Sequence, residues 1–367
     1  MATSTTAILK PVDGATADLA EGKLEAVAAW LFVCCALIFL MVVIGGITRL
    51  TLSGLSITEW KPVVGVFPPL SAADWAVEFA KYKQIPQYRL VHYAMSLDEF
   101  KTIYFWEYLH RLLGRLVGIT YGVPFVWFLV RRQLPRSLVL PLAGILPLGF
   151  GQGALGWYMV ESGLADRPEV SQYRLVAHLA LALAIYAAIL WTALGIVRGP
   201  SPDPSPGWRR AAEAVLVLVA LTILAGGYVA GTRAGLTYNT FPLMDGRLVP
   251  SGYAQLQPLW VNWFENIAAV QFDHRVLAVA TVLAVFLLWA AGLRANLPKP
   301  AGKALHLLLA AAVLQVALGI STLLLVVPIP LAAAHQAGAV LLLTAAIVFR
   351  HTLRAAAVMD ARAEATI

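Results

Sequence analysis

Eight long apolar stretches constrain this chain more than any other feature of its sequence. The chain is 60% hydrophobic and only 13% charged, about half the charged fraction of a typical soluble protein. Each stretch reaches the length of about 20 residues that a helix needs to cross a bilayer. The sequence therefore predicts an all-α polytopic membrane protein with eight transmembrane helices, at about 27–49, 104–130, 138–159, 172–197, 210–231, 267–291, 303–327 and 331–351.

Cations gather in alternate connections between these stretches. One short loop holds Arg131, Arg132 and Arg136, and further arginines and lysines lie at 198–210, 294–303 and 350–362. The positive-inside rule then places both termini and these loops in the cytoplasm. We expect a disordered cytoplasmic tail over 1–26, a linker over 198–209, a second tail over 352–367, and outward-facing connections at 50–103, 160–171, 232–266 and 328–330.

The large outer connection at 50–103 carries two capping-box patterns. Ser71 with Asp74 and Ser96 with Glu99 each predict the start of a short helix. The first of these helices places Trp75, Phe79 and Tyr82 near one face. Two interpretations stay open for that helix, namely one resting on the membrane interface and a lid over a site.

The charge and the cysteines exclude some functions. The net charge of +7 fits cytoplasmic loops that contact anionic membrane lipid. No basic run or aromatic RNA-binding motif indicates nucleic-acid binding. The two cysteines, Cys34 and Cys35, are adjacent in the first apolar stretch, and we interpret them as small packing residues.

The chain repeats itself. Gly45-Gly46 recurs as Gly226-Gly227 at an offset of 181, and His110-Arg111 recurs as His274-Arg275 at an offset of 164. Gln152 recurs as Gln315, and His178 recurs as His335. Residues 27–197 and 210–351 are therefore predicted to be two copies of a four-helix unit. Because four is an even number of spans, the copies keep one orientation, about an axis along the membrane normal.

Four histidines, namely His110, His178, His274 and His335, lie in the even-numbered spans, four to seven residues after each predicted start. At 1.5 Å rise per residue they share a depth of about 10 Å below the outer ends, one pair in each bundle. Two ligands are too few for structural zinc, whereas two axial imidazoles on facing helices suit a heme. Hydrogen-bonded packing and a proton relay are the alternatives. Glycines near these positions would let a flat macrocycle approach: Gly114, Gly118, Gly153, Gly156, Gly319 and Gly338.

Four arginines near the outer ends of spans are candidates to meet the heme propionates. They are Arg49, Arg111, Arg233 and Arg275. The alternative for each is an interfacial arginine that extends its charged end to water.

The two halves differ beside their histidines. Glu107 aligns with Gln271, and Arg115 aligns with Val279, at the same offset of 164. Only the first half thus carries a carboxylate one turn from its histidine, where it can take or give protons. We infer one reactive heme site in the first half and one electron-relay heme site in the second. The alternative is that Glu107 only pairs with Arg111.

Several of these motifs together resemble the heme A synthase family, and the resemblance covers nearly the whole chain. The long first outer connection, which lacks the cysteine pair of another subgroup, is similar to the mitochondrial and alphaproteobacterial members. The motifs are Gly45-Gly46-Ile47-Thr48-Arg49-Leu50-Thr51, Ser53-Gly54-Leu55-Ser56, Trp60-Lys61-Pro62, Glu107-Tyr108-Leu109-His110-Arg111, Gly151-Gln152-Gly153, Asn239-Thr240-Phe241-Pro242-Leu243-Met244 and Phe272-Asp273-His274-Arg275.

The resemblance implies an enzyme of the bacterial inner membrane that oxidises the C8 methyl of heme O to a formyl group, through a hydroxymethyl intermediate. It implies substrate heme between His110 and His178. It implies a permanent heme b whose iron is held by His274 and His335, and Glu107 as the catalytic acid or base. Heme A then serves cytochrome c oxidase assembly, heme O synthase is the expected delivering partner, and a homo-oligomer is compatible with the sequence.

Two functions from other classes compete with this one. A two-heme electron-transfer cytochrome would place its hemes at two depths to cross the membrane, and it would not need the unequal Glu107 and Gln271. A heme carrier without chemistry is the other alternative. Replacing Glu107 by Gln separates both from an enzyme.

Overall fold

The computed structural model describes residues 14–60, 65–165, 170–198 and 206–354. Within these ranges eight helices are long and apolar enough to cross a membrane, and no strand is formed. The chain is therefore an integral, multi-pass, all-α membrane protein, as predicted. The eight helices are α1 (Gly14–Leu50), α4 (Leu97–Val130), α5 (Arg136–Ala165), α6 (Gln172–Val197), α7 (Pro206–Gly231), α9 (Ile267–Gly292), α10 (Lys299–Leu324) and α11 (Ile329–Thr352).

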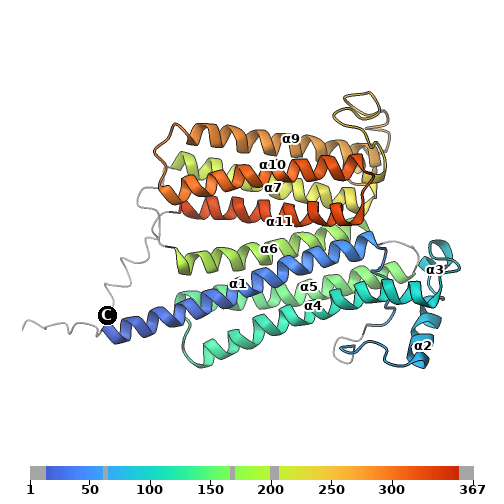
Figure 1. Cartoon of the computed structure of the whole chain (residues 1–367), viewed down its shortest axis with the longest axis horizontal. Helices are drawn as coiled ribbons and strands as arrows, with labels where there is room; N and C mark the ends of the chain where they lie inside the picture. The colour runs from blue at the N-terminus through green and yellow to red at the C-terminus, as the bar shows by residue number, and fades with distance from the viewer. Residues whose placement is uncertain (1–13, 61–64, 166–169, 199–205, 355–367) are drawn as a thin grey trace, which may run out of the picture.

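The eight helices form two rings of four. In the first ring α1 contacts α4, α4 contacts α5, α5 contacts α6, and α6 contacts α1. In the second ring α7, α9, α10 and α11 contact one another in the same order, and Figure 1 shows the two bundles side by side. The bundles meet through α6 with α7, α1 with α11, and α6 with α11. A twofold axis along the helices would exchange α1 with α7 and α6 with α11. It would therefore exchange the first two of these contacts and map the third onto itself.

Several boundaries differ from the expected ones. Helix α1 already begins at Gly14, so the disordered tail expected over 1–26 is wrong for 14–26, while 1–13 lie outside the described residues. Alanine, leucine, glutamate and lysine, which favour helix, are common there. The expected linker over 198–209 is also too long, because α7 begins at Pro206. Of the expected tail over 352–367, residues 355–367 lie outside the described residues.

Both predicted capping boxes are confirmed. The side chains of Ser71 and Ser96 accept from the backbone N–H groups of Asp74 and Glu99, whose carboxylates bond back to the serine N–H groups. Ser71 opens α2 (Ala72–Tyr82). Ser96 opens the 34-residue helix α4 and not a short helix, so α4 starts earlier than the expected 104.

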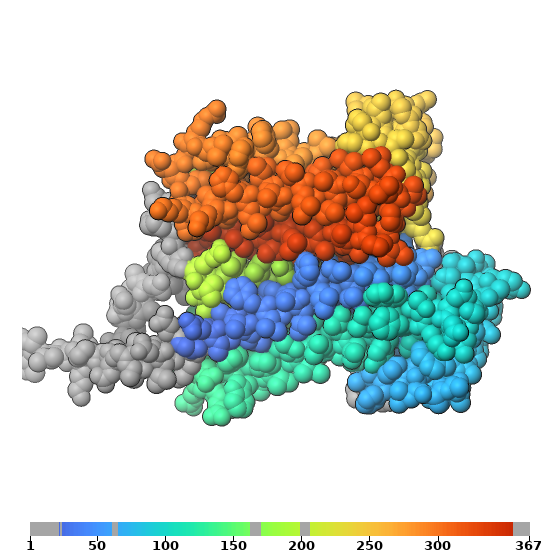
Figure 2. All heavy atoms as spheres, viewed as in Figure 1, coloured from blue at the N-terminus to red at the C-terminus, as the bar shows by residue number. Residues whose placement is uncertain are grey.

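The two long connections that were expected to face outward carry further short elements at one end of the molecule. The first holds α2 and α3 (Pro86–Leu90), and the second holds η1 (Ala234–Leu236), η2 (Leu259–Val261) and α8 (Asn262–Glu265). Figure 2 shows both projecting from the same end of the bundles, in blue-cyan and yellow. The apolar face of α2 packs on the extension of α4, where Phe79 stacks on Phe100 at 4.9 Å. That face is therefore covered by protein.

Candidate functional site

Each of the four membrane histidines stands against a glycine of the neighbouring helix. A Cβ added to that glycine would lie between 2.8 and 3.0 Å from the Cε1 atom of the imidazole, a distance at which something has to move. Only glycine therefore leaves room for the ring in its present position. The pairs are Gly45 of α1 with His110 of α4, Gly156 of α5 with His178 of α6, Gly226 of α7 with His274 of α9, and Gly319 of α10 with His335 of α11.

The histidines of each half lie on helices at opposite corners of one ring. Helices α4 and α6 are diagonal in the first ring, and α9 and α11 are diagonal in the second. Gly45, Gly226 and Gly319 each lie five residues before the end of their helix, or about 7 Å along the axis. The histidines facing them therefore share one depth, close to the end that carries the large connections.

Two glutamines that recur in the internal repeat, Gln152 and Gln315, form hydrogen bonds to the histidines of α6 and α11. Gln315 Nε2 lies 3.2 Å from His335 Nδ1 and donates to the His335 carbonyl at 2.9 Å. Gln152 Nε2 lies 3.3 Å from His178 Nε2 and donates to the His178 carbonyl at 3.1 Å. These contacts fix the positions of the His178 and His335 rings, and the recurrence of the two glutamines in the sequence is the signal that marks them.

The remaining ring nitrogens bear on whether a heme fits. His274 Nδ1 lies 3.1 Å from the carbonyl oxygen of Thr222, which selects the N–H tautomer there and leaves Nε2 for a metal. Among the described residues, the buried Nδ1 atoms of His110 and His178 have no hydrogen-bond partner. Buried polar atoms normally have one. A pair of imidazoles on diagonal helices of a bundle, with ring nitrogens that have no hydrogen-bond partner among the described residues, fits a heme with two axial histidines.

Glu107 is buried at the end of the first bundle and is held by three donors. Its Oε2 accepts from the Ser56 hydroxyl and the Ile57 N–H, each at 2.7 Å. Its Oε1 pairs with Arg111 at 2.5 Å, and only 3% of the Glu107 side chain is exposed. Arg111 also donates to the carbonyl of Ile57 at 2.8 Å. The pair with Arg111 considered above thus exists, and it ties α4 to the loop after α1.

We call the pair Glu107 and Arg111, with the loop backbone that it holds, the clasp of the first bundle. The second bundle contains a matching clasp in which Gln271 replaces the carboxylate. Gln271 Nε2 donates to the carbonyls of Ala234 and Thr237, and its Oε1 accepts from Arg275 at 2.9 Å. Arg275 in turn donates to the carbonyls of Tyr238 and Thr240. Tyr238 is the repeat counterpart of Ile57. The two clasps therefore differ chiefly in that one buried position carries a charge.

The four candidate propionate arginines fall into two groups. Arg111 and Arg275 lie in the clasps and give most of their donors to loop carbonyls. Arg49 donates to the carbonyls of Ala230 and Gly231 and thus joins the two bundles. Arg233 adopts a left-handed conformation just before η1. The structure does not bring all four together, and their contact with propionates stays a prediction.

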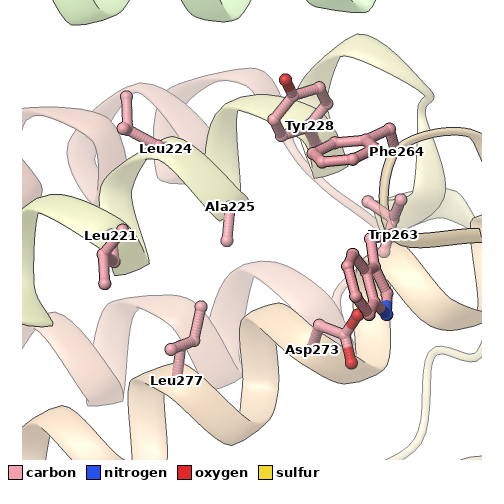
Figure 3. Close-up of a pocket in the computed structure, with 9 residues that line it drawn as sticks. Leu221, Leu224, Ala225, Tyr228, Trp263, Phe264, Asp273 and Leu277 are labelled. Carbon is pink, nitrogen blue, oxygen red and sulfur yellow. The ribbon is translucent and has the colours of Figure 1, made fainter. Parts of the chain in front are cut away.

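One pocket lies on the flank of the second bundle. Figure 3 shows it between α7 and α9, with Trp263 and Phe264 of α8 at one end. Its volume is about 320 Å³, and of the described residues that line it Asp273 alone is charged. The sequence did not predict it.

The chain is similar to known proteins over most of its length. Residues 28–347 match the family model COX15-CtaA, described as cytochrome oxidase assembly protein. A protein of Nitrosospira multiformis named Heme A synthase is 54% identical over 332 residues, 89% of this chain and 93% of that protein. Proteins of the same name from Rhodospirillum centenum and Caulobacter vibrioides are 53% and 46% identical, covering 94% and 92% of this chain and 92% and 99% of their own lengths.

Proposed function

The chain belongs to the COX15-CtaA family of cytochrome oxidase assembly proteins. We propose that its two bundles have different roles in a heme A synthase reaction. The activity is that of a membrane oxidoreductase that acts on heme, converting heme O to heme A by oxidation of the C8 methyl to a formyl group. The division of labour assigns the substrate to the first bundle and a resident heme b to the second.

The histidine couples are the proposed ligands. His110 and His178 would take the iron of heme O, and His274 and His335 the iron of heme b. The glycine contacts and the diagonal helices support this assignment, because a neighbouring glycine positions each imidazole and the two histidines of a couple lie on opposite helices of one bundle. Heme b supplies one-electron redox chemistry when bound. Gln152, Gln315 and the Thr222 carbonyl orient the rings that would hold the two irons.

Glu107 is the proposed catalytic residue, and one observation carries this proposal. The clasps of the two bundles match in their arginines and in the loops they hold, yet only the first has a carboxylate. Gln271 holds its loop without a charge, so the loop itself does not require one. A buried carboxylate beside the substrate ligand His110 can accept a proton released at the reacting methyl carbon.

The remaining proposals concern the heme propionates, the orientation in the membrane and the source of the substrate. Arg275 retains a buried Nε–H without a partner among the described residues, so it keeps a donor for a propionate; Arg49, Arg111 and Arg233 are proposed for the same task. The end with the large connections faces outward, both termini face the cytoplasm, and the membrane is the bacterial inner membrane. Heme O synthase is the proposed source of the substrate.

Replacing Glu107 by Gln tests the catalytic assignment. We expect heme A formation to fall at least about 100-fold, the usual range for loss of a general base, while heme b remains bound in the second bundle. Ser56→Ala is the matched control, because it removes one donor to Glu107 but keeps the carboxylate. Heme A formation at the parent rate in Glu107→Gln would contradict the assignment. Equal loss in Ser56→Ala would show that the clasp, not the charge, is what matters.

A further inference from the structure

The pocket on the flank of the second bundle has an apolar body and one acidic end. Leu221 and Leu277 lie toward one end, whereas Asp273 lies at the other beside Trp263 (Figure 3). Leu221 is 48% exposed on a membrane-spanning helix, so the pocket opens toward lipid. An ionisable residue on such a wall is costly and usually functional.

The internal repeat indicates that the four-helix arrangement does not by itself create this pocket. At the offset of 181 the counterpart of Ala225 is Ile44, and at the offset of 164 the counterpart of Asp273 is Leu109. In the first half, larger or apolar side chains thus stand where the second half has a methyl group and a carboxylate. The second bundle alone has both the space and the acid.

The acidic end offers a hydrogen-bond acceptor next to aromatic rings. Asp273 Oδ1 accepts from the Tyr253 hydroxyl at 2.8 Å, and Oδ2 accepts no hydrogen bond from the described residues. The rings of Tyr228 and Phe264 lie 5.1 Å apart, and both line the pocket with Trp263. A flat ring that carries a hydroxyl group would find stacking partners and a charged acceptor at the same place.

We propose that this pocket binds the ring of an isoprenoid quinol, with a ring hydroxyl donating to Asp273 and the tail lying along Leu221 and Leu277 toward the lipid. No lysine or arginine is among the described residues that line the pocket, and the carboxylate of Asp273 would repel a phosphate headgroup, so a phospholipid matches it poorly. The quinol and its oxidised form are also the class of lipid-soluble electron carrier with which a membrane oxidoreductase can exchange. Asp273 directly precedes His274 in the chain. The proposed binding of the quinol does not depend on whether His274 binds heme.

The test measures binding of decyl-benzoquinol to the full-length protein in phosphatidylcholine nanodiscs, by calorimetry and by photo-crosslinking with an azido derivative. The two variants copy the first half, namely Asp273→Leu and Ala225→Ile. Val276→Ile on the exposed face of α9 is the matched control. We expect saturable binding that weakens at least about tenfold in both variants, the loss expected when a charged hydrogen bond is removed or a cavity is filled. Binding in the control should be unchanged, and the label should map to α7, α8 or α9.

The outcomes separate this proposal from its alternatives and from the proposed function. Displacement of the quinol by phosphatidylglycerol or by farnesol as readily as by unlabelled quinol would show an acyl or prenyl groove and overturn the proposal. Unchanged binding in Ala225→Ile, or a label on α1 or α4, would do the same. His274→Ala should keep quinol binding, so a failure of the heme assignment leaves this result standing. Unchanged heme spectra of Asp273→Leu, Ala225→Ile and Val276→Ile exclude unfolding as the cause of weaker binding in the two test variants.

Discussion

The imidazole of His274 lies against Gly226 of the neighbouring helix so closely that a Cβ on that glycine would stand 2.9 Å from Cε1. The same relationship holds for the other three histidines. A packed interior does not yield readily to an added methyl group, so each glycine fixes the position of one imidazole. If the two imidazoles of a bundle bind a heme iron as proposed, the neighbouring helix therefore decides where the ligand nitrogen points.

Gly226→Ala and Gly319→Ala should each weaken retention of heme b. The added methyl group has to displace the ring of His274 or His335, and overpacking of this kind costs about 1–3 kcal/mol. We expect heme b per mole of purified protein to fall, by about tenfold in a titration of apoprotein. Gly302→Ala on α10 is the control, because a Cβ there would meet no other helix or side chain of the described residues within 4 Å. Full heme b content in both test variants would contradict the positioning role.

Gln315→Leu and Gln152→Leu should affect different hemes. Gln315 bonds the carbonyl and approaches a ring nitrogen of His335, and Gln152 does the same for His178. Loss of a group that orients a metal ligand typically costs about 10–100-fold in affinity. The first variant should weaken heme b binding and shift its reduction potential, whereas the second should weaken heme O binding only. Spectroscopic titration with each heme measures this. Equal effects of both variants on one heme would contradict separate sites.

The long connection between α1 and α4 should loosen in acid through His92. Its Nδ1 is hydrogen bonded to the Tyr82 hydroxyl at 2.6 Å, and burial lowers the pKa of His92, which nearby Glu99 partly offsets. Because the folded state favours the neutral ring, this contribution is complete above the unfolded pKa of about 6.5 and is lost as the pH falls through the lowered folded pKa. Proteolysis of the loop at about pH 5 should therefore be faster than at about pH 8.

His92→Gln provides the control for that prediction. The glutamine keeps a hydrogen-bonding group near Tyr82 but does not titrate, so proteolysis of its loop should change little across the same range. A variant whose loop loosens as much as the parent loop would show that other groups, and not His92, cause the change. A parent loop cut equally fast at both pH values would contradict the prediction directly.

The spans and the four histidines could be predicted because they are visible in single stretches of sequence. An imidazole inside an apolar run stands out, and its recurrence at matching positions pairs it with a partner. The start of α4 at Leu97 differs from the expected 104, although the capping box at Ser96 is visible in the sequence. No glycine or proline separates Leu97 from Tyr104, so nothing ends the helix that Ser96 begins.

The clasps and the glycine contacts could not be predicted, because they join distant parts of the chain. Glu107 accepts from the backbone of Ile57, and a backbone N–H leaves no mark in a sequence. Gly156 and Gly319 were expected to admit a macrocycle, but the structure places imidazoles against them. Which helices are neighbours decides that contact, and helix order within a bundle is a property of the fold. The pocket beside Asp273 likewise needs α8 folded over α7 and α9.

Extraction of the bound porphyrins from purified His274→Ala and His110→Ala tests the central claim most directly. The claim is that two matching bundles hold two hemes in different roles. The account predicts that His274→Ala loses protoheme, while His110→Ala keeps protoheme and loses the farnesylated hemes. If both variants lose the same porphyrin, or if His274→Ala keeps its full protoheme content, the division between the bundles is contradicted.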